Sequence, residues 1–323
     1  MIRKFKKALI TGITGSGGSY LAEHLLKKNI KVYGFYRSKG NLNLLKSNNR
    51  NKIIFHKIDL CNYNLLRKKL LQIRPDVIFH IASDADVKKS FEYPIQNAYN
   101  NNTITINLLE AIRKSKAKVD PVIMICSTSE VYGNVSKKEL PIKETQQIAP
   151  INPYAVTKTF QDLISQVYNK SFGLKIIITR MFSYTNARRN NLFQTAFANQ
   201  IIKIQLGKQK FLSHGNLNSL RTFVDIEDAM EAYWLAATKG KIGEIYNIGG
   251  DDIISVKNYL KELISLSSKK IMCKLDKKLL RPTDILVQIP DSTKFRKHTG
   301  WKPTVSFRES IKKFYMECKK NVR

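Results

Sequence analysis

Long hydrophobic runs are missing from this sequence of 323 residues. Apolar runs such as those at 122–126 and 176–178 are far shorter than the roughly 18 to 20 apolar residues that a membrane-spanning helix needs. The basic N-terminus is followed by an apolar stretch that breaks at Thr11 and Gly12, too soon for the core of a secretory signal. We therefore predict a protein with neither a membrane partner nor an export signal.

Cysteine is also scarce, and no spacing suggests a disulfide framework, a zinc site or a redox motif. The four cysteines lie far apart at Cys61, Cys126, Cys273 and Cys318. The five histidines are equally scattered, so we expect no metal. These features favour a reducing, cytoplasmic setting.

Acidic residues are few, with 25 Asp and Glu against 56 Lys and Arg and a formal net charge of +31. A basic surface of this size is the first sign of a nucleic-acid-binding protein. The lysines, however, are spread along the whole chain, and no helix-turn-helix, zinc-finger or aromatic stacking motif accompanies them. We interpret most of the charge as solvated surface and predict no nucleic-acid partner.

Linkers rich in Gly, Pro or Ser are absent too, and 43% of the residues are apolar, enough for a large core. Over the first 180 residues, short apolar runs alternate with amphipathic stretches of helical length, as in βαβ units. We predict an α/β fold: a Rossmann-type doubly wound parallel sheet over 1–186, and a smaller mixed α/β lobe over 187–323 packed directly on it. The boundary is approximate, because the chain can cross over again near the C-terminus. The predicted strands are 8–11, 32–36, 53–58, 77–81, 122–126 and 176–179.

A glycine-rich turn follows the first predicted strand. Glycines at positions 12, 15 and 18 give the spacing G-x-x-G-x-x-G, between a strand and a helix. Glycine permits the tight turn and the close approach of backbone N–H groups to a pyrophosphate at a helix N-terminus. The pattern predicts a dinucleotide site formed by Gly12, Thr14, Gly15, Ser16, Gly17 and Gly18.

The end of the second predicted strand bears on which dinucleotide binds. An acidic residue there would bind the ribose 2′-hydroxyl of NAD, whereas Arg37 and Ser38 suit the 2′-phosphate of NADP. NADP is therefore the predicted cofactor, with NAD less favoured. The alternative is that Arg37 belongs to the generally basic surface.

Two further segments carry side chains suited to catalysis. Tyr154 and Lys158 are four residues apart on a helix predicted to start with Asn152 as N-cap and Pro153, so they share one face. A neighbouring ammonium favours phenolate, so we expect a lowered Tyr154 pKa.

Thr128 and Glu130 follow the fifth predicted strand. Open α/β sheets bind their ligands at the carboxyl ends of the strands. Thr128 would hydrogen-bond a reacting hydroxyl, and Glu130 would act as a second acid or base.

The glycine loop, Thr128, Tyr154 and Lys158 together resemble the extended short-chain dehydrogenase/reductases, which act on nucleotide sugars. This resemblance implies further cofactor contacts from Asp59, Leu60 and Ala82. Two subgroups acting on GDP-sugars compete. The residues 11–23, 87–94, 128–130 and 188–189 resemble GDP-mannose 4,6-dehydratases, while 152–158, 215–217, 221–228 and 281–282 also resemble GDP-4-keto-6-deoxymannose reductases.

The resemblance implies a 4,6-dehydratase that makes a 4-keto-6-deoxy sugar by internal hydride transfer through NADP. Tyr154, helped by Lys158 and Thr128, would remove the proton of the C4 hydroxyl as hydride passes from C4 to NADP. Glu130 would take the C5 proton and help protonate the departing C6 hydroxyl. A reductase needs no such carboxylate, and Glu130 is our reason for favouring the dehydratase. A reductase, a 4-epimerase and a non-catalytic dinucleotide-sensing or RNA-binding protein remain as alternatives.

The substrate site departs from the family pattern, because Ser183 stands where an asparagine usually contacts the sugar. This favours another GDP-hexose, such as the GDP-N-acetylglucosamine used in legionaminic acid synthesis, besides GDP-mannose. The implied substrate-binding residues are Ser183, Asn216, Arg221 and Arg281. The resemblance also implies a homodimer formed by the Tyr154 helix and the helix beginning near residue 95, or a tetramer.

Overall fold

A parallel sheet of seven strands forms the centre of the larger lobe in the computed structural model, which describes residues 2–280 and 283–321. The strand order is β10-β6-β5-β4-β1-β2-β3, and it reverses between β1 and β4. Their bounds are β1 (Lys7–Thr11), β2 (Lys31–Tyr36), β3 (Ile53–Lys57), β4 (Val77–His80), β5 (Val122–Thr128), β6 (Ile176–Met181) and β10 (Ile245–Ile248). The predicted Rossmann-type sheet is thereby confirmed, with each predicted strand in place.

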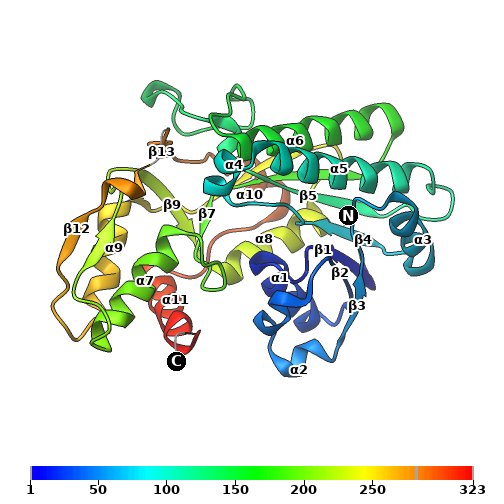
Figure 1. The fold of residues 1–323 in the computed structure, drawn as a ribbon. Coiled ribbons are helices and arrows are strands. Elements are labelled where there is room, and N and C mark those ends of the chain that lie inside the picture. Colours follow the sequence, from blue (N-terminus) through cyan, green and yellow to red (C-terminus); the bar gives the residue numbers. More distant parts are fainter. Residues whose placement is uncertain (1, 281–282, 322–323) are drawn as a thin grey trace.

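Helices cover both faces of this sheet (Figure 1). One face carries α3 (Tyr63–Ile73), α5 (Pro94–Arg113) and α6 (Pro153–Phe172), and the other carries α1 (Ser16–Lys27), α8 (Ile226–Lys239) and α10 (Thr293–Thr299). The short helices α2 (Ser47–Arg50) and α4 (Val87–Glu92) lie in the connections. None of the helices within the described ranges is long and apolar enough to cross a membrane.

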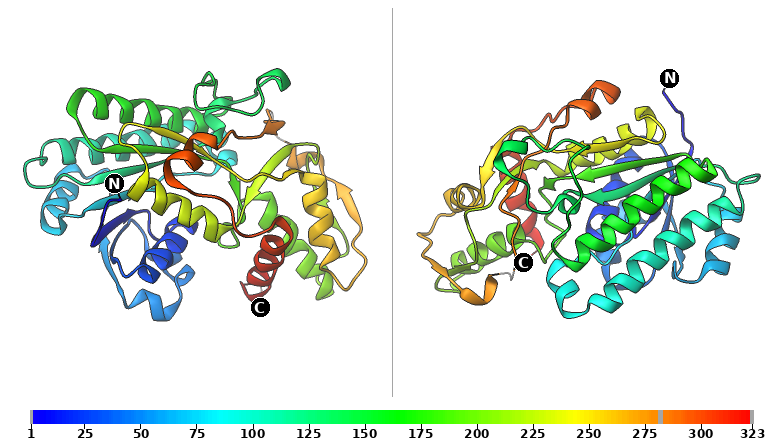
Figure 2. Two further views of the ribbon diagram at one scale, coloured as in Figure 1. Left: turned by 180° about the vertical axis from the view of Figure 1, so that it is seen from behind. Right: turned by 90° about the horizontal axis from the view of Figure 1, so that it is seen from above.

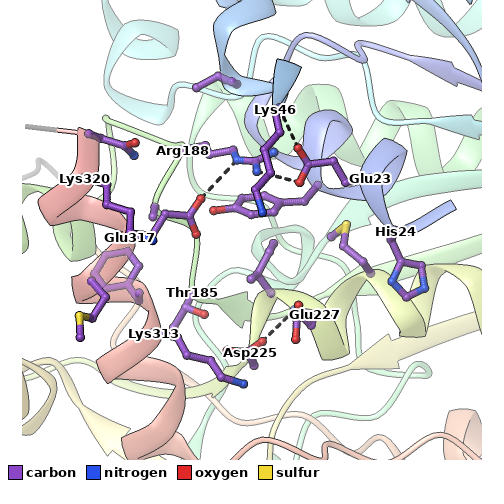
Figure 3. A pocket seen from close by; sticks show the side chains of 18 of the residues that line it. Glu23, His24, Lys46, Thr185, Arg188, Asp225, Glu227, Lys313, Glu317 and Lys320 are labelled. Carbon is purple, nitrogen blue, oxygen red and sulfur yellow. Dashed lines mark hydrogen bonds and ion pairs between the residues drawn. The ribbon is translucent and has the colours of Figure 1, made fainter. Parts of the chain in front are cut away.

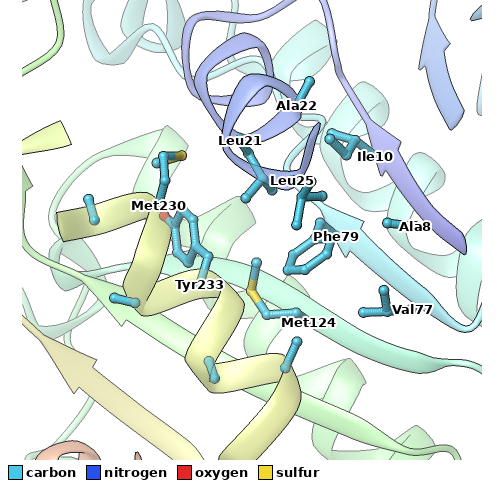
Figure 4. Packing of buried hydrophobic residues seen from close by; sticks show 14 of the residues in the cluster. Ala8, Ile10, Leu21, Ala22, Leu25, Val77, Phe79, Met124, Met230 and Tyr233 are labelled. Carbon is cyan, nitrogen blue, oxygen red and sulfur yellow. The ribbon is translucent and has the colours of Figure 1, made fainter. Parts of the chain in front are cut away.

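The alternation of side chains along β1 explains why the sheet is buried on both sides. Ala8 and Ile10 pack in the cluster beneath α1 and α8, whereas Leu9 packs in the cluster beneath α3 and α5. In Figure 4, Ala8 and Ile10 lie at one side of this cluster and Tyr233 of α8 at the other, with Leu25 of α1 and Phe79 between them. Successive strand residues point to opposite faces, so a strand covered on both faces reads as a continuous apolar run.

The helix α6, which bears Tyr154 and Lys158, begins as the sequence predicts. The side chain of Asn152 caps it by accepting a hydrogen bond from the Ala155 N–H at 2.8 Å, and Pro153 occupies the first turn. Gly173 ends the helix in the left-handed region at φ +62°.

The smaller lobe has its own sheets and its own core (Figure 2). Strand β9 pairs with β7, β11 and β13, and β8 pairs with β12. Helices α7, α9 and α11 pack around a cluster that includes Phe197, Tyr259 and Phe314. The bounds are β7 (Ser183–Tyr184), α7 (Phe193–Gln205), β8 (Leu212–His214), β9 (Leu220–Val224), β11 (Ile253–Ser255), α9 (Val256–Ser265), β12 (Cys273–Leu275), β13 (Val287–Gln288) and α11 (Phe307–Asn321).

The chain crosses between the two lobes more than once. After β9 of the smaller lobe, α8 packs on α1 and β10 pairs with β6 in the large sheet, and α10 later returns to the same face. Residues beyond 186 therefore complete the larger lobe, since the apolar faces of α8 and β10 are buried there. Short 3₁₀ turns connect other elements: η1 (Lys39–Leu44), η2 (Ser129–Tyr132), η3 (Lys137–Glu139) and η4 (Lys277–Leu279).

A buried ion pair joins the elements around the carboxyl end of β5. Arg180 of β6 and Asp162 of α6 are 2% and 0% exposed, and the guanidinium donates two hydrogen bonds, of 2.8 and 3.1 Å, to the carboxylate. Arg180 also donates to the Tyr132 hydroxyl, and Asp162 accepts from Ser127, at 3.1 Å, next to Thr128. The pair thus holds α6, β6, the end of β5 and η2 together.

We predict that Asp162→Ala lowers the free energy of unfolding by about 3–5 kcal/mol, because it leaves the Arg180 guanidinium buried without its counter-charge. Urea unfolding measures this. The double variant Arg180→Met with Asp162→Leu should recover most of the loss. Glu309→Gln, which removes the exposed ion pair with Lys313, serves as the control and should change the value by less than about 1 kcal/mol. An Asp162→Ala variant as stable as the parent would contradict the assigned role.

Candidate active site

The glycine loop turns tightly between β1 and α1. Gly12 has a φ of +72°, and a Cβ atom there would lie 2.8 Å from the Ala82 Cα. A Cβ atom on Gly18 would lie 2.3 Å from the Gly12 carbonyl oxygen. Glycine is therefore needed at position 12 both for the positive φ and because the backbone after β4 passes so close to it. Glycine is needed at position 18 because the helix α1 packs directly against the loop.

The first turn of α1 leaves backbone donors free for an anion. Gly15 is its N-cap and brings no side-chain oxygen, Thr14 lies in the turn before it, and the helix opens with Ser16 and Gly17. Backbone N–H groups at an uncapped helix start, together with the helix dipole, favour a phosphate group. The residues present fit the diphosphate of a dinucleotide.

The other predicted cofactor residues follow neighbouring strands at the same edge of the sheet. Arg37 and Ser38 follow β2 and are exposed, Asp59 and Leu60 follow β3, and Ala82 follows β4. The Arg37 guanidinium donates a 2.9 Å hydrogen bond to Asn100 of α5. Strands β3, β2, β1 and β4 are consecutive in the sheet, so these residues form one row along its carboxyl edge. The row spans the switch point, the place between β1 and β4 at which the strand order reverses.

Short contacts link Thr128 and Glu130 to the start of α6. Thr128 ends β5, and its hydroxyl accepts the Glu130 N–H at 3.3 Å. The Glu130 carboxylate accepts a 2.8 Å hydrogen bond from the side-chain amide of Asn152, the residue that caps α6 two positions before Tyr154. The structure thus brings the carboxylate and the tyrosine helix together, and Asn152 positions both.

Tyr154 is 9% exposed, and its N–H donates to the Ser90 hydroxyl at 3.2 Å. Burial raises the pKa of the Tyr154 phenol above its usual value of 10.0, and the nearby Arg189 cation opposes this only in part. The lowered pKa expected from the sequence is wrong for this structure, because desolvation of the phenolate outweighs the nearby positive charge.

Lys158 lies one turn further along α6 and is 3% exposed. Its ammonium donates to the Cys126 carbonyl oxygen and to the side-chain oxygen of Gln161. Burial lowers the pKa of Lys158 to about 8, although Asp162 opposes the change. The lysine is therefore fixed in direction and partly deprotonated near pH 8.

Two side chains that the sequence did not single out for a role also reach this region. Arg189 donates a 2.7 Å hydrogen bond to the Ala85 carbonyl oxygen, and its charge opposes the raised pKa of both Tyr154 and Tyr184. The Tyr184 hydroxyl lies 3.4 Å from where a Cβ atom on Gly17 would be. No local pattern marks Tyr184, since its place near the glycine loop depends on the pairing of β7 with β9.

The predicted substrate residues that the structure describes lie on the smaller lobe. Ser183 of β7 pairs with Phe223 of β9, two residues from Arg221. The Arg221 guanidinium donates to the carbonyl oxygens of Leu220 and Ile285, and the Asn216 side chain donates to Asp284 at 2.8 Å. Arg281 lies outside the described residues.

A separate cavity of about 940 Å³ lies between α1, residues 43–49, the start of α8 and α11 (Figure 3). Of the predicted catalytic, cofactor and substrate residues that the structure describes, none lines it. Among the residues that the structure describes, no three His, Cys, Asp or Glu side chains are grouped to hold a metal ion.

A glycine loop at the switch point of a parallel sheet, with Thr128 at the end of β5 and Tyr154 and Lys158 on α6, defines an extended short-chain dehydrogenase/reductase. The chain belongs to the GDP-mannose 4,6 dehydratase family, whose model matches residues 9–314. The predicted class of enzyme, a nucleotide-sugar 4,6-dehydratase and hence a lyase, is thereby confirmed.

Individual relatives agree along nearly the whole chain. GDP-mannose 4,6 dehydratase 1 of Arabidopsis thaliana is 31% identical, over 97% of this chain and 89% of its own. The UDP-glucuronic acid 4-epimerase of Bacillus cereus, in complex with UDP-glucuronic acid and NAD, has a TM-score of 0.83 at 29% identity, covering 98% of this chain and 99% of its own. RMD from Pseudomonas aeruginosa complexed with NADPH shares the fold, with a TM-score of 0.85 at 22% identity, 98% of this chain and 100% of its own being covered.

The buried ammonium of Lys158 predicts a pH-dependent stability. Its folded pKa of about 8 lies below the usual 10.5, so the unfolded chain binds more protons between these values and stability rises with pH. Relative to Lys158→Met, the parent should gain about 2 kcal/mol between about pH 7 and pH 9.5. Urea unfolding of both proteins at the two pH values measures this. A difference that does not change with pH would show that the amine is not a buried cation.

Proposed function

We propose that the protein is a GDP-sugar 4,6-dehydratase that uses NADP and converts a GDP-hexose into its 4-keto-6-deoxy derivative. The observation that carries the proposal is the placement of Glu130. The Glu130 backbone N–H is bonded to the Thr128 hydroxyl, and the Glu130 carboxylate to Asn152, the cap of the Tyr154 helix. This carboxylate would supply the second acid/base that dehydration needs and that reduction of a ketone does not.

The side chains divide the proton transfers between them. Tyr154 takes the proton of the C4 hydroxyl, which Thr128 orients, and the resulting ketone acidifies the C5 proton. Glu130 removes that proton and protonates the departing C6 hydroxyl. NADP, held by the residues at the glycine loop, would supply the hydride transfer between C4 and C6, with no net consumption of cofactor.

The raised pKa of Tyr154 means that neighbouring cations must favour its ionised form. Burial favours the neutral phenol, whereas only the phenolate can accept the proton of the C4 hydroxyl, so ionisation of Tyr154 needs positive charge close by. Arg189 already opposes the effect of burial, and Lys158, whose direction is set by Cys126 and Gln161, supplies a second cation. We propose that these two side chains stabilise the phenolate.

The proposal of NADP rests on the row of residues at the carboxyl edge of the sheet. Gly12 and Gly18 form a cradle that a Cβ atom would fill, and the first turn of α1 offers free N–H groups. Arg37 and Ser38 would hold the 2′-phosphate, since no acidic residue ends β2 to bind a free 2′-hydroxyl. Asp59, Leu60 and Ala82 would line the adenosine and the ribose beside it.

The nucleotide sugar would bind on the smaller lobe. The Arg221 guanidinium is directed by the carbonyl oxygens of Leu220 and Ile285, and we assign it to the diphosphate together with Arg281. Ser183 and Asn216 would contact the sugar and the nucleotide. Because Ser183 replaces an amide side chain of the family pattern with a shorter hydroxyl, both GDP-N-acetylglucosamine and GDP-mannose are candidate substrates. We place the reaction in the cytoplasm.

The reaction is tested by incubating the protein with GDP-mannose or GDP-N-acetylglucosamine and NADP⁺, with mass spectrometry of the product. We expect loss of one water, abolished in Tyr154→Phe and reduced at least about 100-fold in Glu130→Gln, because each removes a proton-transfer group. Both variants should still bind NADP. Oxidation of NADPH by a 4-keto sugar without any dehydration would show a reductase instead, and an isomer of unchanged mass would show an epimerase.

We also propose a homodimer formed through α5 and α6. These helices pack side by side, and their outer faces expose apolar side chains, with Tyr99 at 67%, Val156 at 53% and Leu163 at 48%. Ile106, Val167 and Phe172 extend the same surface. A second copy of both helices would bury these side chains in a bundle of four helices.

Replacing Leu163 and Val167 together by Glu should convert the dimer into a monomer, because the carboxylates would be desolvated in the apolar contact. Sedimentation velocity measures the change. Ile253→Glu, at an apolar residue of the smaller lobe exposed to a similar degree, is the matched control and should leave the dimer intact. A parent protein that sediments as a monomer would refute the interface.

A further inference from the structure

Glu23 of α1 binds two segments that are distant in the sequence. One carboxylate oxygen accepts the Lys46 backbone N–H at 3.0 Å, and the other accepts the Arg188 guanidinium at 2.9 Å. Figure 3 shows Glu23 between Lys46 and Arg188 at the wall of the cavity. Glu23 is 8% exposed, so both contacts are made largely out of water.

The contact with Lys46 fixes the far end of the segment that carries Arg37 and Ser38. This segment leaves the sheet at Tyr36, passes through η1 and returns to the core at Leu45, which is 1% exposed. The cavity lies between residues 43–46 and α11, so helix α11 gives this part of the segment little direct support. Leu45, the hydrogen bond from Lys46 to Glu23, and the hydrogen bond from the Arg50 guanidinium to the Leu45 carbonyl oxygen anchor the end of the segment.

The second partner, Arg188, holds Glu23 in place. Its side chain is 5% exposed, stacks 3.8 Å from the centre of the Tyr20 ring and donates to the Ser19 hydroxyl in the first turns of α1. It also reaches Glu317 of α11 at 3.4 Å. Arg188 thus neutralises Glu23 and directs one of its oxygens, which leaves the other oxygen turned toward Lys46.

We propose that Glu23 is a positioning residue that sets the preference for NADP over NAD, by holding the segment on which Arg37 and Ser38 lie. This inference rests on the cofactor site proposed above. A guanidinium strengthens binding of a 2′-phosphate only when its backbone is held at the right distance, since ordering a loose segment opposes the gain. NAD lacks that phosphate, so its binding does not depend on the segment in the same way.

The variant Glu23→Gln tests the inference with little change of shape. An amide has one acceptor oxygen and turns an NH₂ group toward the other donor, so it cannot serve Lys46 and Arg188 together. We expect the Kd for NADP to rise about tenfold and the Kd for NAD to change less than about twofold. Isothermal titration of the full-length protein, without sugar substrate, measures both constants.

Two further variants control for charge and for folding. Glu309→Gln makes the same substitution at an exposed site on α11, and should leave both constants unchanged. Arg188→Lys keeps the charge but loses the guanidinium fork, and should shift the NADP constant in the same direction as Glu23→Gln by a smaller factor. It takes the place of Glu23→Gln should that variant fail to fold.

The outcomes separate this inference from the cofactor proposal. Equal weakening of NADP and NAD, or an unchanged ratio of the two constants, would show that Glu23 serves folding alone and would overturn its assigned role. Arg37→Gln tests the 2′-phosphate site by itself. NADP binding that is unchanged in Arg37→Gln would refute the cofactor site, whereas a loss there with an unchanged ratio in Glu23→Gln would refute only the role of Glu23.

Discussion

The buried ion pair between Arg180 and Asp162 is the interaction on which the arrangement of the proposed catalytic groups depends. Two charges removed from water are stable only with well-directed hydrogen bonds, and here each partner is bonded on several sides. Those bonds join α6, β6, the end of β5 and η2, the elements that carry Tyr154, Lys158, Thr128 and Glu130 or adjoin them. Catalysis by proton transfer needs such fixed distances between groups from different elements.

A second buried pair, between Arg188 and Glu23, lies where the two lobes meet. Helix α1 packs in the core of the large sheet and α11 in the core of the smaller lobe, and Arg188 contacts acidic side chains of both. Its neighbour Arg189 instead donates a hydrogen bond to the Ala85 carbonyl oxygen. Adjacent arginines therefore serve two regions of the molecule.

Many features of the fold and of the candidate site could be predicted from local sequence pattern. The strands, the glycine loop and the Asn152 cap of α6 were all predictable, because each depends on the residues within one or two turns of chain. The hydrogen bond from Asn152 to Glu130 was not, nor was the return of α8 and β10 to the large sheet. The Tyr154 pKa was predicted in the wrong direction, since spacing on a helix shows a nearby lysine but not the depth of burial.

The sequence by itself determined the class of fold, the position of the dinucleotide loop and the set of Thr128, Tyr154 and Lys158, because hydrophobic period and glycine spacing are local properties of the chain. Only the tertiary structure decided which way Lys158 points, that Asn152 holds Glu130, and that Glu23 joins Lys46 to Arg188. Those contacts link residues far apart in the chain, and their electrostatics depend on how much water the packed elements exclude.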